Sequence, residues 1–270
     1  MPKAISDIPK PKSFYRITKP NLTKVIHGDC FSAMDELIKN GMKFDMIFAD
    51  PPYFLSNGGI TCQSGKMVKV NKGTWDKSQG QKLNHEFNTE WLRRCQELLA
   101  DHGTIWVSGT MHVIYSIGFA MQQLEMKILN NITWQKPNPP PNLSGRYFTH
   151  STETLLWAKK SEKCKHKYNY TLMKEENDGK QMKDVWTFTT ASKSEKTIGK
   201  HPTQKPIALL DRIIRASTDK GGSILDPFLG SGTTSVAALL NYRDSIGIEQ
   251  KKEYCQIAKN RIHLAQKKMI

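Results

Sequence analysis

Residues 223–249 restrict the fold of this chain more than any other stretch. The apolar strand Ser223-Ile224-Leu225 runs into Asp226-Pro227-Phe228-Leu229-Gly230-Ser231-Gly232-Thr233-Thr234, and then come a helix over 235–240 and a strand over 244–248 that ends at Glu249. Two glycines at this spacing permit a tight turn and the close approach of a ligand to the backbone. The next helix directs free N–H groups at an anionic group, and an acid after the next strand accepts the hydroxyls of a ribose. The stretch therefore predicts one nucleotide-binding half of an α/β sheet, although position 235 is serine and the full glycine fingerprint is absent.

Strand and helix patterns alternate through most of the remaining chain. Strands are predicted over 24–29, 44–49, 103–108 and 128–134, and helices over 30–39, 86–99, 113–124, 207–216 and 253–268. Residues 54–82 are polar and rich in glycine, which is typical of a long loop beside a site. The alternation predicts an α/β fold with a doubly wound, mostly parallel mixed sheet and helices on both faces. Trp106 and Trp134 are expected in its core.

One segment interrupts this alternation and divides the chain. Residues 136–200 open with Pro137-Asn138-Pro139-Pro140-Pro141-Asn142 and contain one predicted strand, at 154–158. We interpret 136–200 as a specificity insertion and 1–20 as a basic N-terminal arm. Residues 21–135 and 201–270 then form the α/β domain. Tyr168 and Tyr170 are expected to pack within the insertion.

The charge of the chain indicates its partner. Lys and Arg total 40 and Asp and Glu total 25, so the formal net charge of the 270 residues is +15. Such an excess favours a polyanion, because basic side chains release counterions from it and steer its approach. Hydrophobic residues make up 38% of the chain, which is enough to bury a core and excludes wholesale disorder.

Location and redox state also leave signals in the sequence. No run of about 18 apolar residues occurs, which excludes a membrane span, and residues 1–20 lack the apolar region of a secretory signal. A cytoplasmic location is therefore expected. The scattered cysteines form no CxxC pair, so we expect reduced thiols, no disulfide framework and no metal site. They are Cys30, Cys62, Cys95, Cys164 and Cys255.

The tetrapeptide Asp50-Pro51-Pro52-Tyr53 follows an apolar strand directly, where ligand crevices of α/β sheets lie. An amine conjugated into a base, such as N6 of adenine, is a poor nucleophile. The carboxylate of Asp50 and the carbonyl of Pro51 can each accept one amine hydrogen and free the lone pair for attack on a methyl sulfonium. The two prolines fix the direction of that carbonyl, and Tyr53 offers a face for stacking. The methyl donor that fits the glycine turn is S-adenosylmethionine, because its anionic group is small.

These two motifs resemble those of amino-group DNA methyltransferases that modify adenine N6. The catalytic motif precedes the cofactor motif, as in the β class, and His201-Pro202-Thr203-Gln204-Lys205-Pro206 matches a further β-class motif. The resemblance runs from about residue 22 to 265. Residues 54–59 and 142–153 are similar to the second GATC adenine methylase of Dpn-type restriction systems.

The resemblance implies roles for individual residues. Asp50 and Pro51 orient N6, Pro52 stiffens the motif, and Tyr53 stacks on the target base. The cofactor site contains Asp29, Cys30, Lys205, Asp226, Phe228, Gly230, Ser231, Gly232, Thr233 and Glu249. Within this set, Ser231, Thr233 and Lys205 lie near the methionine carboxylate and Glu249 binds the ribose. Asp29 contacts the adenine of the cofactor, and its alternative role is that of a helix N-cap.

The insertion is the expected place of target recognition. Its DNA-binding candidates are Arg146, Tyr147, His150, Lys159 and Lys160, with Lys165 and His166 nearby, because they can serve phosphates and base edges. The function expected is transfer of a methyl group to adenine N6 in DNA within a restriction-modification system. Three alternatives stay open: cytosine-N4 methylation, methylation of RNA or protein, and a non-catalytic DNA-binding module. The sequence leaves open the strand preference, a homodimer and a cognate restriction endonuclease.

Overall fold

The computed structural model describes residues 22–55, 60–63, 66–69, 76, 78–199 and 201–269, so the predicted arm at 1–20 lies outside the described residues. Its centre is an eight-stranded sheet with the order β1-β10-β9-β2-β5-β7-β6-β8. These strands are β1 (Thr23–His27), β2 (Phe44–Ala49), β5 (Leu99–Gly109), β6 (Lys127–Gln135), β7 (Thr152–Lys159), β8 (Val185–Thr187), β9 (Ser223–Asp226) and β10 (Asp244–Glu249).

Strand direction in this sheet determines where the chemistry lies. The five strands from β1 to β5 in the sheet order are parallel, whereas β7 runs antiparallel to both of its neighbours. The carboxyl ends of the parallel strands therefore meet at one edge. Asp29, Glu249, Asp226 and Asp50 lie at the ends of four adjacent strands on this edge. The predicted doubly wound mixed sheet is confirmed.

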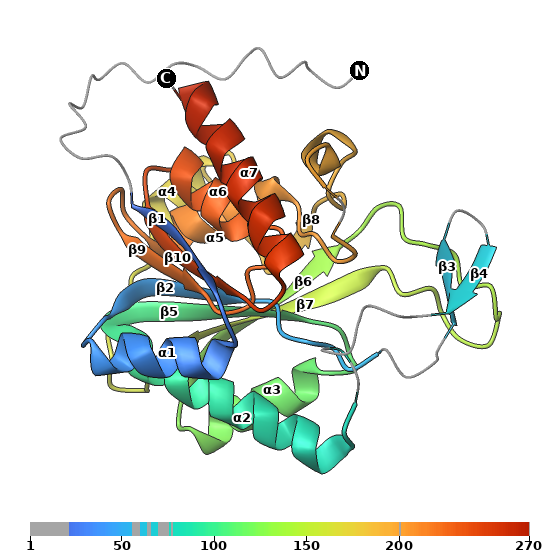
Figure 1. The fold of residues 1–270 in the computed structure, drawn as a ribbon, viewed down its shortest axis with the longest axis horizontal. Coiled ribbons are helices and arrows are strands. Elements are labelled where there is room, and N and C mark those ends of the chain that lie inside the picture. The colour runs from blue at the N-terminus through green and yellow to red at the C-terminus, as the bar shows by residue number, and fades with distance from the viewer. Residues whose placement is uncertain are drawn as a thin grey trace.

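Helices cover both faces of the sheet (Figure 1). The first group, which packs on one face, is α1 (Cys30–Lys39), α2 (Gln81–Leu98) and α3 (Ile114–Gln123). The second group, on the other face, is α5 (Ile207–Ser217), α6 (Thr233–Leu240) and α7 (Lys252–Met269), with the short α4 (Tyr170–Glu175) beyond α5. Alternation along β2 explains the two layers, because Ile47 packs with the first group and Met46 and Phe48 pack with the second.

The core contains the tryptophans that the sequence places there. Trp106 and Trp134 are buried, and the indole of Trp106 stacks on that of Trp157 at a centroid distance of 4.8 Å. Tyr168 is partly exposed and contacts Trp157 of the central sheet and Tyr170 edge to face, with centroids 5.2 and 6.0 Å apart. Burial of such large rings supplies much of the hydrophobic stabilisation of this layer.

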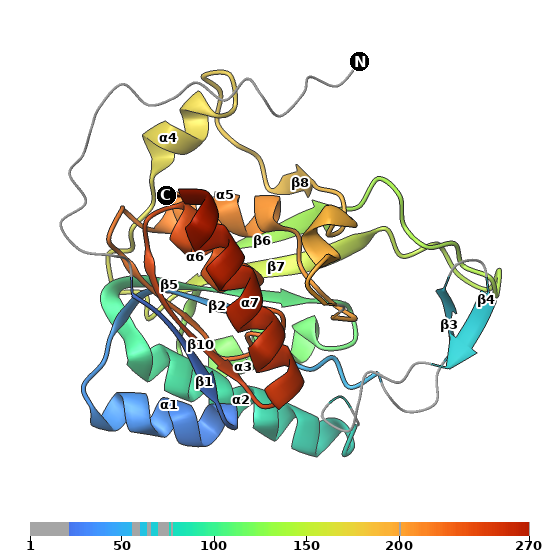
Figure 2. The same cartoon turned by 45° about the horizontal axis from the view of Figure 1, so that its top comes forward.

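Two expectations about long segments need correction. β7 lies inside the main sheet between β5 and β6, so residues 152–159 of the predicted insertion belong to the central sheet. The reason is that β7 completes the hydrogen bonding of β5, which would otherwise be an exposed edge. Within the predicted loop over 54–82, β3 (Ile60–Gln63) and β4 (Lys66–Lys69) form an antiparallel hairpin. Figures 1 and 2 both show this hairpin standing away from the main sheet, beside the loop that joins β6 to β7.

The described residues bear on two further predictions, those about a membrane span and about the cysteines. Among the described residues, no helix is both long and apolar enough to cross a bilayer. Cys30, Cys95, Cys164 and Cys255 are free thiols, and the side chain of Cys62 lies outside the description.

Candidate active site

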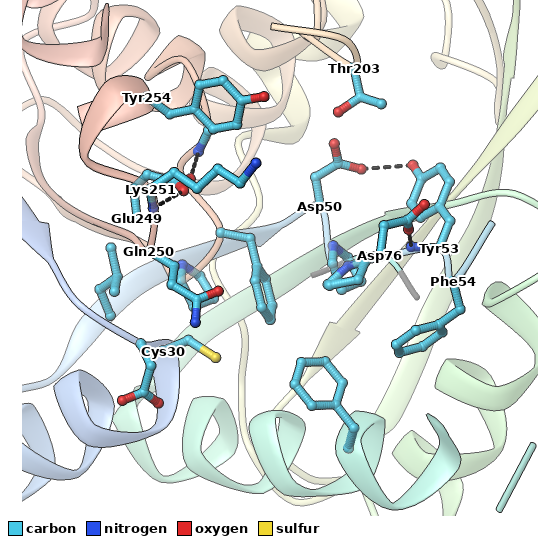
Figure 3. A pocket seen from close by; sticks show the side chains of 18 of the residues that line it. Cys30, Asp50, Tyr53, Phe54, Asp76, Thr203, Glu249, Gln250, Lys251 and Tyr254 are labelled. Carbon is cyan, nitrogen blue, oxygen red and sulfur yellow. Dashed lines mark hydrogen bonds between the residues drawn. The ribbon is translucent and has the colours of Figure 1, made fainter. Parts of the chain in front are cut away.

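The two motifs share one cavity of about 430 Å³. It opens at the carboxyl edge of the parallel strands. The Asp50-Pro51-Pro52-Tyr53 motif lines one side, and Pro227, Phe228, Gly230 and Glu249 line the other. Figure 3 shows Asp50 and Tyr53 facing the cavity opposite Glu249, Gln250, Lys251 and Tyr254. The common cavity that the sequence predicts for the two motifs is therefore present.

Hydrogen bonds fix the catalytic motif after β2. The hydroxyl of Tyr53 donates to Oδ1 of Asp50 at 2.7 Å. The buried carboxylate of Asp76 accepts from the main-chain nitrogens of Tyr53 and Leu55, at 2.9 and 3.1 Å, and so holds the chain that leaves the two prolines. Burial, followed by the charges of Asp50 and Glu153, raises the pKa of Tyr53 well above its usual value. Tyr53 is therefore a neutral hydrogen-bond donor to Asp50.

Lys205 lies behind this motif. Its ammonium is 2.6 Å from Oδ2 of Asp50, 3.3 Å from the hydroxyl of Tyr53 and 3.5 Å from Oε2 of Glu153. Glu153 in turn forms an ion pair with Lys136. We refer to Asp50, Glu153, Lys136 and Lys205 as the acid–lysine cluster. The resemblance places Lys205 near the cofactor carboxylate, but the structure places its ammonium on Asp50, because two carboxylates converge there.

Two members of the cluster, Lys205 and Glu153, are held in their charged forms. Burial would lower the pKa of Lys205, but the charges of Asp50 and Glu153 outweigh burial and the pKa is raised. Burial would likewise raise the pKa of Glu153, but Lys205 and Lys136 outweigh it and that pKa is lowered. Lys205 and Glu153 therefore stabilise each other's charged form, although both are largely buried.

On the opposite side of the cavity, Glu249 ties two loops together. Its Oε2 accepts from the main-chain nitrogen of Gly230 at 2.8 Å, and its Oε1 accepts from that of Lys251 at 2.7 Å. Burial raises the pKa of this carboxyl. The ring of Phe228 projects beside it and meets that of Trp91 edge to face, with centroids 5.4 Å apart. These predicted cofactor residues line the cavity.

Asp29 and Cys30 also line the cavity. Oδ1 of Asp29 accepts from the main-chain nitrogens of Phe31 and Ser32, at 2.9 and 3.2 Å, and so caps helix α1. A hydrogen bond from the side chain of Ser32 lowers the pKa of Asp29 most, and the two main-chain bonds lower it further. Burial raises the pKa of the Cys30 thiol to about 12, so this thiol stays protonated. The N-cap alternative for Asp29 is confirmed, and the carboxylate still reaches the cavity.

Besides Lys205, four residues of the predicted cofactor set are not among the described residues that line the cavity. Asp226 is buried and accepts from the main-chain nitrogen of Phe228 at 3.0 Å. Nη1 of Arg261 donates to Oγ of Ser231 at 2.9 Å and to Oγ1 of Thr233 at 3.0 Å, from the side of α7. Gly232 faces Ala258 of the same helix. These residues support the glycine turn on the side away from the cavity. The main chain at Gly230 faces the cavity.

The predicted DNA contacts separate into two groups. Arg146, Tyr147 and His150 are exposed on the loop between β6 and β7, which joins these strands at the carboxyl edge of the sheet. Lys159 and Lys160 lie at the opposite edge, where their ammonium groups donate to main-chain carbonyls. Since β7 is antiparallel, its last residues point away from the cavity, and the structure does not bring these two lysines to the site. Lys165 and His166 follow them on the same side.

Several lining residues escaped the sequence reasoning. Phe31, Phe54 and Phe87 form an aromatic wall with centroid distances of 5.3 and 5.9 Å to Phe87. His201, which belongs to the quoted β-class motif but was given no role, meets the ring of Tyr254 edge to face. Glu153, behind the cavity, was not predicted either, because it lies in an ordinary strand pattern. The only advance signal was position, because Phe31 and Phe54 each lie within two residues of a recognised motif.

Comparison with known proteins decides the family. A family model described as DNA methylase matches residues 44–260, which is most of the chain. The chain belongs to the DNA methylase family. It is 57% identical over 251 residues to the Type II methyltransferase M2.DpnII of Streptococcus pneumoniae, covering 91% of this chain and 93% of that protein. It is 51% identical over 239 residues to M2.MboI of Moraxella bovis, covering 88% and 87%. The protein is an enzyme, a DNA methyltransferase.

Solved structures extend the comparison to the fold. The methylase resembles M1.HpyAVI in a complex with SAM, with a TM-score of 0.69 and 29% identity over 89% of this chain and 99% of that one. The cytosine-N4-specific PvuII DNA methyltransferase shares the fold, with a TM-score of 0.68 and 16% identity over 90% of this chain and 86% of that one.

Proposed function

We propose that this enzyme transfers a methyl group from S-adenosylmethionine to N6 of adenine, within GATC sites of DNA. The observation that carries the proposal is the shared cavity, which brings the Asp50-Pro51-Pro52-Tyr53 motif opposite Gly230 and Glu249. The resemblance to GATC adenine methylases of Dpn-type systems supports the choice of base and site.

The residues of the cavity fit this cofactor. Four acids and one lysine are among its described lining residues: Asp29, Asp50, Asp76, Glu249 and Lys251. Such an excess of carboxylates suits a positively charged sulfonium and disfavours a ligand with several phosphates. When bound, S-adenosylmethionine supplies a methyl group activated by that sulfonium. Glu249 would hold the ribose of the cofactor, and Phe228 would contact its adenine ring. Gly230, which has no side chain, would leave room for the methionine part of the cofactor.

The catalytic motif acts on the amine of the target base. Asp50 accepts one amine hydrogen and the carbonyl of Pro51 accepts the other, which releases the nitrogen lone pair from the ring. Tyr53 keeps the carboxylate of Asp50 oriented through the 2.7 Å hydrogen bond. Since both oxygens of a carboxylate carry two lone pairs, Asp50 can bond Tyr53 and still accept from the base. Closure of the aromatic side chains around the base excludes water from the reacting atoms.

The target base must leave the DNA stack to reach this cavity. The loop between β6 and β7 is the proposed contact, with Arg146, Tyr147 and His150 toward the phosphates and base edges. Phe148, next to them, is 97% exposed. Aromatic side chains at such positions stack on bases or fill the gap that an extruded base leaves.

The test is to label plasmid DNA with tritiated cofactor, digest it to nucleosides and identify the modified base. We expect the label in N6-methyladenine, and an oligonucleotide with GATC to be labelled while one with GATT is not. Label in N4-methylcytosine, or no label in the DNA, contradicts the proposal. Asp50→Ala should lower the labelling rate by about 100-fold or more, because the acceptor that orients the amine is lost. The variant should still bind the cofactor.

The setting of this reaction is part of the same proposal. The relatives are named Type II methyltransferases, which supports a restriction-modification system with a cognate endonuclease. A cytoplasmic location, where its DNA substrate would lie, belongs to the same proposal. Sedimentation of the purified chain with and without a GATC duplex would show whether a homodimer forms.

A further inference from the structure

The acid–lysine cluster connects the catalytic carboxylate to a second buried acid. The side chain of Lys205 is only 7% exposed and lies between Asp50 on one side and Glu153 on the other. Ser108 of β5 and the hydroxyl of Tyr53 complete the contacts of Oε2 of Glu153, each at 3.5 Å. Glu153 is the second residue of β7, and Lys136 directly follows β6, so these elements bring all four charges together.

The cluster reaches the reacting groups only through Asp50 and Tyr53. Lys205, Glu153 and Lys136 are not among the described residues that line the cavity, whereas Asp50 and Tyr53 are. A cation at 2.6 Å from Oδ2 and a phenol at 2.7 Å from Oδ1 leave the Asp50 carboxylate a single orientation. Such charge-assisted bonds are stronger and more directional than bonds between neutral groups.

We propose that Lys205 and Glu153 are positioning residues for methyl transfer: Glu153 holds the ammonium of Lys205, and this ammonium holds the Asp50 carboxylate toward the target amine. The inference rests on the proposed function and gives Lys205 a role other than binding the cofactor. Lys136 balances the charge of Glu153, so that the charge of Lys205 remains for Asp50. A misplacement of about 1 Å at a reacting group costs on the order of 100-fold in rate.

The test separates positioning from cofactor binding through the kinetic constants of Lys205→Met, Lys205→Arg and Glu153→Gln. We expect Lys205→Met to lower kcat by about 100-fold, because the carboxylate of Asp50 loses its fixed orientation. The dissociation constant of S-adenosylmethionine, measured by calorimetry, should change by less than about three-fold, since Lys205 does not line the cavity. The kcat of Lys205→Arg should be at least ten-fold higher than that of Lys205→Met. The kcat of Glu153→Gln should be about ten-fold lower than that of the wild type.

A pH profile supplies a readout that a purely structural role does not move. In Lys205→Met, Asp50 and Glu153 face each other without the shared cation, with Tyr53, Ser108 and Lys136 around them. Like charges repel, so the acid limb of kcat should shift to higher pH than in the wild type. The double variant Lys205→Met with Glu153→Gln removes one charge of each sign, and its acid limb should lie closer to that of the wild type.

Folding and the matched control are measured in parallel. Removal of one partner from a buried ion pair destabilises a protein, so the charge-balanced double variant serves if Lys205→Met does not fold. Lys167→Met, which breaks the Lys167–Asp219 pair at 2.6 Å far from the cavity, should keep kcat. A weaker cofactor affinity with unchanged kcat in Lys205→Met, or in the double variant, overturns the proposal. If the wild type makes no methyladenine, the proposed function fails instead.

Discussion

The main-chain nitrogen of Gly230 donates to the carboxylate of Glu249 at 2.8 Å and thereby joins the glycine turn after β9 to the end of β10. Gly230 has a φ of +55°, and a Cβ there would lie 3.1 Å from Nε2 of His201. The turn therefore presents its bare main chain to the cavity and depends on Glu249 for its shape.

The first prediction concerns this contact. Glu249→Ala removes the acceptor of two main-chain N–H groups and the proposed ribose ligand. Hydrogen bonds to charged groups contribute about 1.5–3 kcal/mol, so the dissociation constant of S-adenosylmethionine should rise by about 10- to 100-fold in calorimetry. Glu249→Gln, which retains one oxygen acceptor, should give a dissociation constant between those of the wild type and Glu249→Ala. Glu253→Gln, exposed on the same loop-helix junction, is the matched control, and equal affinities of the Glu249 and Glu253 variants would contradict the assignment.

The second prediction concerns pH and stability. Burial raises the pKa of Asp226 from 3.8 to about 7. The folded state thus holds a proton that the unfolded state has lost, so the stability from this group is complete below pH 3.8 and disappears as the pH rises toward 7. The shift corresponds to about 4 kcal/mol. Asp226→Asn cannot ionise, so its free energy of unfolding relative to the wild type should increase between pH 5 and pH 7 and then level off.

Urea unfolding at several pH values measures this difference. Asp244→Asn, at the start of β10 and half-buried, is a control for the loss of a carboxylate elsewhere. Parallel pH curves for the wild type and Asp226→Asn would show that Asp226 ionises normally in the folded protein.

The sequence pattern around a single strand was enough to predict the site residues that lie at the end of that strand. Asp50 and Glu249 each come after an apolar run, and parallel strands bring such ends to one edge of the sheet. The same argument predicted Gly230 and Phe228, because a glycine turn must follow its strand. These predictions needed no knowledge of distant contacts.

Placement that depends on strand direction could not be predicted. The apolar pattern of β7 is the same in either direction, yet its antiparallel course puts Glu153 beside the site and Lys159 at the far edge. Lys205 has a long flexible stem, and which carboxylate it reaches depends on the packing of β7 against β5. The donor that Ser231 and Thr233 bind, Arg261, lies 28 residues beyond Thr233 and carries no local signal.

The third prediction follows from Arg261. Its Nη1 donates to the carbonyl of Ser231 at 2.8 Å as well as to the two hydroxyls, and the side chain is buried. Arg261→Met keeps the apolar stem but leaves these acceptors unpaired, so the free energy of unfolding should fall by about 2–4 kcal/mol. Urea unfolding tests this against Lys259→Met, an exposed change on the same helix. Similar stabilities of the two variants would mean that Arg261 does not support the turn.

The fourth prediction concerns Phe148 and the state of the DNA. If its exposed ring fills the gap left by the extruded adenine, Phe148→Ala should lower methylation of a GATC duplex by about ten-fold, because base–aromatic stacking contributes about 1–3 kcal/mol. A single strand has no stack to open, so its methylation should change by less than about three-fold. Phe119→Ala, 54% exposed on α3, is the matched control and should change neither rate. Equal losses on duplex and single strand would assign Phe148 to general DNA binding rather than to base extrusion.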